Sequence, residues 1–160
     1  MLVEAHYNFP IAYIGGTFDP APLKLFQTSA DQTWIGQWET GVGYVIKNVV
    51  VASNGNAYVA IEPSSSVDPT TDGGVHWTLV TSYDLTGYSA EMPIAGAFTL
   101  TSSAGGGLTL GNAAGTIAIK ATAAQTAAMA PSNPKWHLQL TDPSGDVYFP
   151  VGGNIKFVMP

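Results

Sequence analysis

Short β-forming segments follow one another along the whole chain and leave almost no room for helix. Segments rich in Val, Ile, Thr and Tyr recur at intervals of about 8–12 residues. Eighteen glycines and eleven prolines supply the turns between them. One short helix is predicted within 123–130, where Pro131 ends it. This spacing predicts an all-β fold whose antiparallel sheets pack as a β-sandwich.

A hairpin signal lies near the middle of the first half of the chain. Asn54-Gly55 separates two apolar runs, 44–52 and 57–61. Asn-Gly between apolar runs strongly favours a hairpin because both residues tolerate positive φ. A polar loop follows and leads to a third run, 75–80. These runs predict a small three-stranded antiparallel meander.

Aromatic residues are concentrated around this meander. Three of the four tryptophans, Trp34, Trp38 and Trp77, lie there, together with Tyr44 and Tyr58. Few other apolar side chains are available in this part of the chain, so aromatic rings must form most of a small core. We predict that Tyr44, Tyr58 and Trp77 form that core.

Sandwich-like strands flank the aromatic segment on both sides. The first ~28 residues are too few to fold alone and need strands from the end of the chain. Because loop tips tolerate inserted domains, an insertion explains this order better than two domains in series. We therefore predict a discontinuous sandwich, 1–28 plus 83–160, that carries an inserted β-module at 29–82.

Charged residues are few and mostly acidic. They make up 10% of the chain, the five basic residues include no arginine, and the net charge is -6. A chain without the guanidinium fork and with this charge is unsuited to a polyanion, so we expect no nucleic-acid partner. No segment approaches the ~20 apolar residues of a membrane helix, so we expect no membrane insertion. Few charges on a folded chain favour a surface covered by partner subunits, among them copies of the chain itself.

Cysteine is absent from the sequence. Its absence excludes disulfides, thiolate chemistry and cysteine-based zinc sites. The amino-terminal stretch has no basic start followed by an apolar core, so we expect synthesis in a cytoplasm without a signal peptide.

The candidate ligand-binding residues lie in the inserted module. Trp34 and Trp38 are four positions apart on a loop or strand, so both are difficult to bury. At least one is then an exposed ring for stacking against a sugar, or else a ring that packs on the sandwich. Asn56 is first a turn residue and second a hydrogen-bonding group for a sugar, and His76 completes the predicted ligand set.

No residue pattern indicates metal binding. Asp68 and Asp72 flank a Pro-Thr-Thr segment and have the carboxylates that calcium prefers, but two loop carboxylates are more often solvated. The three histidines, His6, His76 and His137, are isolated in the sequence and show no metal-ligand spacing. We expect no metal and no cofactor.

Catalysis has equally little support. The chain has no Gly-x-Ser-x-Gly elbow, no P-loop and no zincin motif. Glu39 and Glu62 are conceivable as a glycosidase pair, but nothing around either residue tunes a carboxyl pKa. We predict no catalytic residues and a protein that is not an enzyme.

The second half of the chain resembles a domain of tailed-bacteriophage structural proteins. The resemblance begins with Asp-Leu-Thr-Gly-Tyr at 84–88 and continues with Ile-Ala-Ile at 117–119 and Thr-Ala-Ala-Gln-Thr-Ala at 122–127. It ends with Leu-Gln-Leu-Thr-Asp-Pro-Ser-Gly-Asp-Val at 138–147 and Gly-Gly-Asn-Ile-Lys-Phe at 152–157. Asn-Phe-Pro-Ile, 8–11, is similar to the opening strand of the same domains. The resemblance implies an immunoglobulin-like sandwich of a baseplate or tail-fibre attachment, a rigid connector found in symmetric assemblies.

The inserted segment resembles the small chitin-binding modules of bacterial chitinases and cellulases, and their relatives in phage fibres. Trp34 or Trp38 opens the pattern, Asn-Gly-Asn-Ala-Tyr-Val-Ala at 54–60 matches its central turn and strand, and Trp77 closes it. Those modules carry exposed aromatic residues where this chain has Ile-Glu-Pro at 61–63. The resemblance implies a module that binds carbohydrate, with a different surface at this position.

These inferences together predict a structural protein of a phage virion, in the tail or baseplate. We expect it to connect other virion proteins and copies of itself, and to contact a host-surface polysaccharide through the module. Repeated weak contacts of about 1 kcal/mol each would then act together. Two alternatives stay open: a capsid decoration or head-fibre protein, and a secreted polysaccharide-binding accessory of a degradative enzyme.

Overall fold

The computed structural model describes residues 5–6 and 12–159, with side-chain environments from residue 12 onward. It confirms the predicted all-β fold class, with one short α-helix. The chain divides into two compact units. We call Phe26–Ser82 the module, and the segments up to Leu25 and from Tyr83 onward the body. The segment 8–11, which resembles the opening strand of the phage domains, lies outside the described residues.

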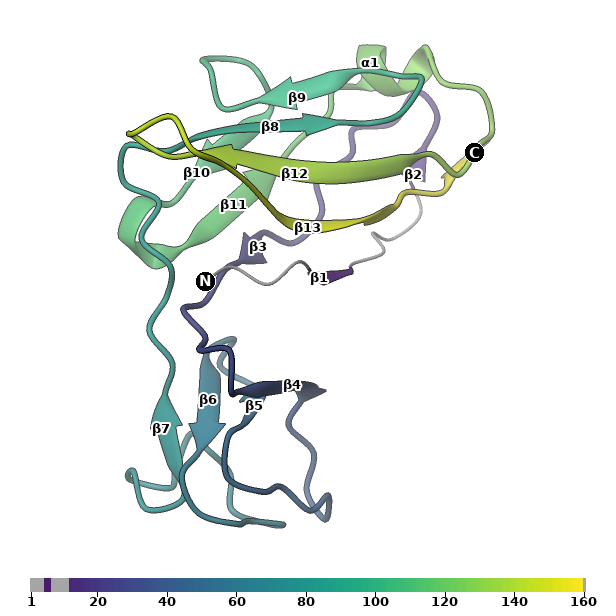
Figure 1. The fold of residues 1–160 in the computed structure, drawn as a ribbon. Coiled ribbons are helices and arrows are strands. Elements are labelled where there is room, and N and C mark those ends of the chain that lie inside the picture. Colours follow the sequence, from purple (N-terminus) through teal and green to yellow (C-terminus); the bar gives the residue numbers. More distant parts are fainter. Residues whose placement is uncertain (1–4, 7–11, 160) are drawn as a thin grey trace. The chain divides into compact units, whose positions relative to one another are not determined.

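Two sheets form the layers of the body (Figure 1). The first has the order β1 (Ala5–His6), β13 (Val147–Asn154), β12 (Lys135–Thr141), β8 (Ser89–Pro93), β9 (Thr99–Thr101). The second has the order β10 (Leu108–Leu110), β11 (Thr116–Ile119), β3 (Leu23–Lys24). A further pair joins β14 (Phe157–Val158) to β2 (Ala12–Tyr13). Most pairs are antiparallel, as predicted, whereas β1–β13 and β14–β2 are parallel.

One apolar core fills the space between these sheets. Strand β12 alternates as its sequence predicts and turns Trp136, Leu138 and Leu140 inward. Ile117 and Ile119 of β11 are fully buried and belong to the same cluster. Side chains from both sheets therefore share one interior, which is the arrangement of a β-sandwich.

The helix α1 (Ala123–Ala127) is shorter than the predicted 123–130. It begins with a capping box, in which the Thr122 hydroxyl accepts from Gln125 N–H and the Gln125 side chain accepts from Thr122 N–H. The Thr126 hydroxyl donates to the Gly16 carbonyl at 2.6 Å and fixes the helix to the start of the chain. A 3-10 turn, η1 (Asn112–Ala114), precedes β11.

The module contains four strands (Figure 1). The predicted meander is present as β5 (Asn48–Val51), β6 (Ala57–Ala60) and β7 (Trp77–Leu79). A fourth strand, β4 (Thr33–Gln37), pairs in parallel with β5. The predicted first strand, 44–52, begins later than expected because Lys47 has a φ of +74° and ends a turn rather than continuing a strand.

Hydrogen bonds bring the two ends of the insertion together, and we call this region the neck. In the body, Tyr83 N–H donates to the Leu25 carbonyl at 2.9 Å, and Leu25 N–H donates to the Gly115 carbonyl at 2.8 Å. In the module, Phe26 and Ser82 form an isolated bridge, and Gln27 N–H donates to the Thr81 carbonyl at 2.9 Å. In each unit, therefore, the incoming and outgoing segments of the chain are hydrogen-bonded to each other. These bonds accompany the division of the chain into two compact units.

Within the described residues, no helix is both long and apolar enough to span a bilayer.

Substitution of Gly115 tests how tightly the body side of the neck is packed. A Cβ there would lie 2.7 Å from the Leu25 carbonyl oxygen and 2.8 Å from that of Tyr83, at a φ of +64°. We expect Gly115→Ala to lower the free energy of unfolding of the body by more than the ~1–3 kcal/mol of a left-handed non-glycine residue. Gly96→Ala is the matched control, because Gly96 has a φ of +72° and nothing within 4 Å of its Cβ position. Denaturant unfolding that gave equal losses for both variants would contradict a tightly packed neck.

Candidate functional site

An aromatic cluster forms most of the core on one face of the module sheet. Tyr44 and Trp77 are each 2% exposed, and their rings meet edge to face with centroids 5.2 Å apart. Tyr58 is half-buried against them, together with Val50 and Ala60. Trp77 Nε1–H donates to the Val67 carbonyl at 2.9 Å, so the cluster also holds the polar loop between β6 and β7.

A β-bulge in β4 (Thr33–Gln37) determines to which face of the sheet Trp34 and Trp38, the two other tryptophans of the module, point. Residues four apart on a regular strand point to the same face. In β4, however, the register shifts between Trp34 and Gly36, which pair with the consecutive residues Val49 and Val50. The extra residue therefore turns Trp34 and Trp38 to opposite faces of the sheet.

Trp38 and Trp34 consequently have different environments. Trp38 packs against the Tyr44–Trp77 cluster, and its indole N–H is buried. The Trp38 ring is therefore partly buried, and it is less available for stacking than that of Trp34. Trp34 is 52% exposed and lies beside Phe26, with ring centroids 6.2 Å apart. Of the two, Trp34 alone offers an exposed ring face.

Asn56 lies in the hairpin turn between β5 and β6. Its backbone N–H donates to the Asn54 side-chain oxygen at 3.0 Å. The Asn56 carbonyl accepts from Ala52 N–H at 2.9 Å. Asn54 also donates from its amide to the Tyr58 hydroxyl at 2.9 Å. These bonds show that both asparagines stabilise the hairpin turn.

His76 contacts the buried carboxylate of Asp72, and no pattern in the sequence predicted this contact. Its Nδ1 lies 2.8 Å from Asp72, whose side chain is only 1% exposed. The same carboxylate accepts from His76 N–H at 2.7 Å and from Trp77 N–H at 2.9 Å. Burial acts to raise the pKa of Asp72, but the bonds from Trp77 and His76 outweigh it and lower the pKa to about 2. Asp72 therefore stays ionised and anchors the loop to the start of β7.

The other predicted loop carboxylate, Asp68, has separate partners. Asp68 is turned to its own loop, where it accepts from Thr70 N–H and from the Thr70 hydroxyl, both at 2.8 Å. No group of three or more His, Cys, Asp or Glu side chains that could hold a metal ion occurs among the described residues. His137 lies on β12 in edge contact with Phe149, at 5.4 Å between centroids. Glu39 and Glu62 are both exposed.

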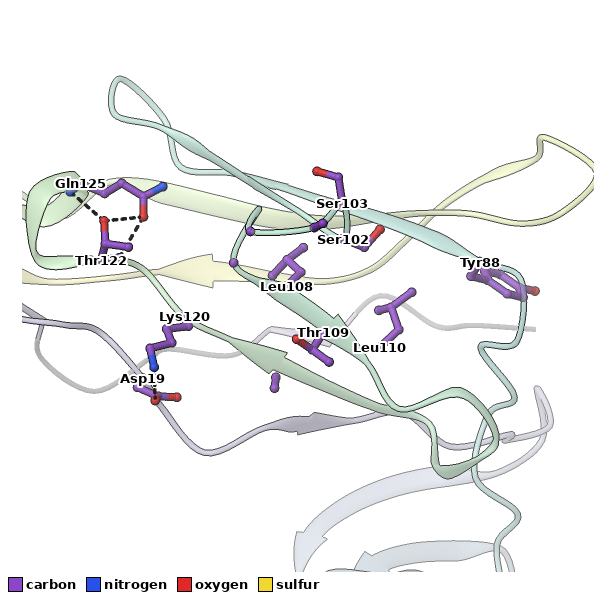
Figure 2. Close-up of a pocket in the computed structure, with 14 residues that line it drawn as sticks. Asp19, Tyr88, Ser102, Ser103, Leu108, Thr109, Leu110, Lys120, Thr122 and Gln125 are labelled. Atoms are coloured by element: carbon purple, nitrogen blue, oxygen red, sulfur yellow. Dashed lines mark hydrogen bonds and ion pairs between the residues drawn. The ribbon is translucent and has the colours of Figure 1, made fainter.

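The body carries an open groove of about 630 Å³ (Figure 2). Short polar and small side chains make up much of its lining, among them Ser102, Ser103 and Thr109. Lys120 and Asp19 lie 3.9 Å apart at one part of it, both largely exposed. At another, the Tyr88 hydroxyl lies 3.0 Å from that of Tyr83, and this bond raises the pKa of Tyr88.

Comparison with known proteins found no match to any family model, curated protein or solved structure.

Asp72 provides a pH test of the loop anchor. Its folded pKa is depressed, so its contribution to stability is complete above the ordinary value of 3.8 and is lost as the pH falls through about 2. We expect Asp72→Asn to lower the thermal midpoint of the module at neutral pH, since the amide cannot accept all three bonds. The difference from the parent should shrink as the pH falls from about 4 to about 2. A difference that stays constant over that range in near-UV circular dichroism would exclude an ionised anchor.

Proposed function

We propose that this protein is a non-enzymatic structural component of a tailed-phage particle, in its tail or baseplate. The body acts as the assembly connector, and the module is the part that binds a host-surface polysaccharide. The phage assignment rests on the order of motifs in the body sequence, from Asp-Leu-Thr-Gly-Tyr at 84–88 to Gly-Gly-Asn-Ile-Lys-Phe at 152–157.

The distribution of exposed apolar side chains is the observation that supports a binding role for the module. Twelve large apolar side chains are exposed in the part of the chain that the structure describes. Eight of them lie in the module, although it is the smaller unit: Trp34, Ile35, Val42, Val45, Ile46, Ile61, Val75 and Leu79. A small unit that keeps so much apolar surface in water is suited to contact with a ligand or partner.

Trp34 is the residue best suited to a sugar. A flat ring can stack against the apolar face of a pyranose, and the indole of Trp34 is half exposed beside Phe26. The exposed side chain of Gln37 can supply hydrogen bonds to hydroxyls, because its partner Val51 lies on the same face of the sheet as Val49, the partner of Trp34. One such ring gives weak binding, and many copies on one particle raise the overall affinity through avidity.

A glycan array of bacterial surface polysaccharides and chitin oligosaccharides tests this role. Particles or beads that display many copies of the full chain should bind at least one glycan, and Trp34→Ala should weaken that binding about fivefold, the equivalent of ~1 kcal/mol. Leu79→Ala is the matched control, since Leu79 is 56% exposed on the opposite face of the sheet. Equal binding by the parent and Trp34→Ala would refute the role of this ring.

The virion role has its own test. Antibodies against the body should label one end of particle tails in electron micrographs of a producing culture. Detection of the protein only as free material, with no labelled particles, would contradict the assignment and favour a secreted accessory protein.

A further inference from the structure

The face of the module sheet that carries Trp34 continues across all four strands. Trp34 of β4 pairs with Val49 of β5. Val49 also pairs with Val59 of β6, which in turn pairs with Thr78 of β7. Side chains of directly paired residues lie on the same face of a sheet. These four side chains therefore form one row across the strands, which we call the Trp34–Thr78 row.

The Trp34–Thr78 row is open to solvent at both ends. Trp34 is 52% exposed, and Thr78 at the other end is exposed as well. Val59 is half-buried and Val49 is buried, and both belong to a small apolar cluster against which Phe26 packs. The row therefore has two accessible ends, joined by an apolar middle that rests on the second small core of the module.

The row is too long for a single sugar ring. Neighbouring strands of a sheet lie ~4.8 Å apart, so the backbones at Trp34 and Thr78 are separated by roughly 14 Å across the four strands. An indole that stacks on one pyranose occupies only the β4 end of this length. A ligand that contacts both ends must therefore contain several linked sugars.

The electrostatics of the row favour an uncharged ligand. The row itself has no charged side chain, and neither have Gln37 and Val51, which lie beside it on the same face. The module as a whole has five acidic residues and one lysine. This excess repels an anionic polysaccharide, and the row has no cation to offset the repulsion. The Gln37 amide and the Thr78 hydroxyl can instead bond to neutral sugar hydroxyls.

We propose that the Trp34–Thr78 row binds an uncharged oligosaccharide that lies across the four strands of the module. The Trp34 ring stacks on one sugar, Val59 contacts the apolar face of a middle sugar, and Thr78 hydrogen-bonds to a sugar farther along the chain. This inference rests on the proposed glycan-binding function. It adds the class of glycan, its direction on the sheet and a second contact residue.

The dependence of affinity on oligosaccharide length tests the row. The full chain is titrated with uncharged chitin, cello- and manno-oligosaccharides, from monomers to hexamers, and binding is followed by nuclear magnetic resonance. In at least one series the affinity should rise by about fivefold for each further weak contact and level off once the ligand spans the row.

The titration separates this inference from the proposed function. Equal affinities for a monosaccharide and a tetrasaccharide would overturn the inference, and so would binding of anionic polysaccharides alone on the glycan array. In both cases the module still binds a glycan, so the proposed function stands. If no glycan of either kind binds, the proposed function and the inference fail together.

Two adjacent residues of β7 provide a matched pair of variants. Thr78 and Leu79 are both exposed but point to opposite faces of the sheet. Thr78→Glu places a charge in the row and should lower the affinity for the tightest-binding oligosaccharide by about fivefold or more, whereas Leu79→Glu should bind like the parent. Equal affinities of the two variants would overturn the inference, and a loss of binding by Trp34→Ala would then still support the proposed function.

Methyl resonances give a readout that needs no substitution. When the tightest-binding oligosaccharide is added, the methyl signals of Val51 and Val59 should shift, because these residues lie on the face of the row. Those of Val50 and Leu79, on the other face, should stay in place. Equal or larger shifts at Val50 and Leu79 would show that the ligand does not follow the row.

Discussion

The neck is the constraint on which the rest of this structure depends. Leu25 and Tyr83 are far apart in the sequence, yet they are joined by a backbone hydrogen bond beside Gly115. This closure lets the amino-terminal strands enter the same sandwich as strands from the end of the chain. It also frees Phe26–Ser82 to form a core of its own. An insertion whose ends meet costs the host fold little more than a longer loop would.

Within the module, a single extra residue in β4 places the rings of Trp34 and Trp38 on different faces of the sheet. Because the bulge turns Trp34 and Trp38 to opposite faces, one tryptophan completes the core around Tyr44 and Trp77 and the other stays in solvent. A regular strand would have buried both or exposed both. Because of the bulge, the Trp38 ring helps to fill the small core, while the Trp34 ring stays on the surface, where a ligand can reach it.

The sequence predicted the fold class and most strands because glycine turns and alternating runs such as 135–141 are local signals. Asn54-Gly55 and the aromatic core were predictable for the same reason. Strand β4 was missed, since its five residues are mostly exposed and show no alternation. The Asp72–His76 bond was missed although the two residues are only four positions apart, because they lie in an irregular loop between β6 and β7 whose sequence shows no regular spacing.

Excision of the module tests the central claim most directly. Joining Leu25 to Tyr83 through two glycines keeps the body side of the neck, where Tyr83 bonds to Leu25 and Leu25 to Gly115. The account predicts that amide resonances of β8, β11 and β12 in a ¹H–¹⁵N correlation spectrum superimpose on those of the full chain. A poorly dispersed spectrum, typical of an unfolded body, would show that the sandwich needs the inserted segment and would contradict a two-unit architecture.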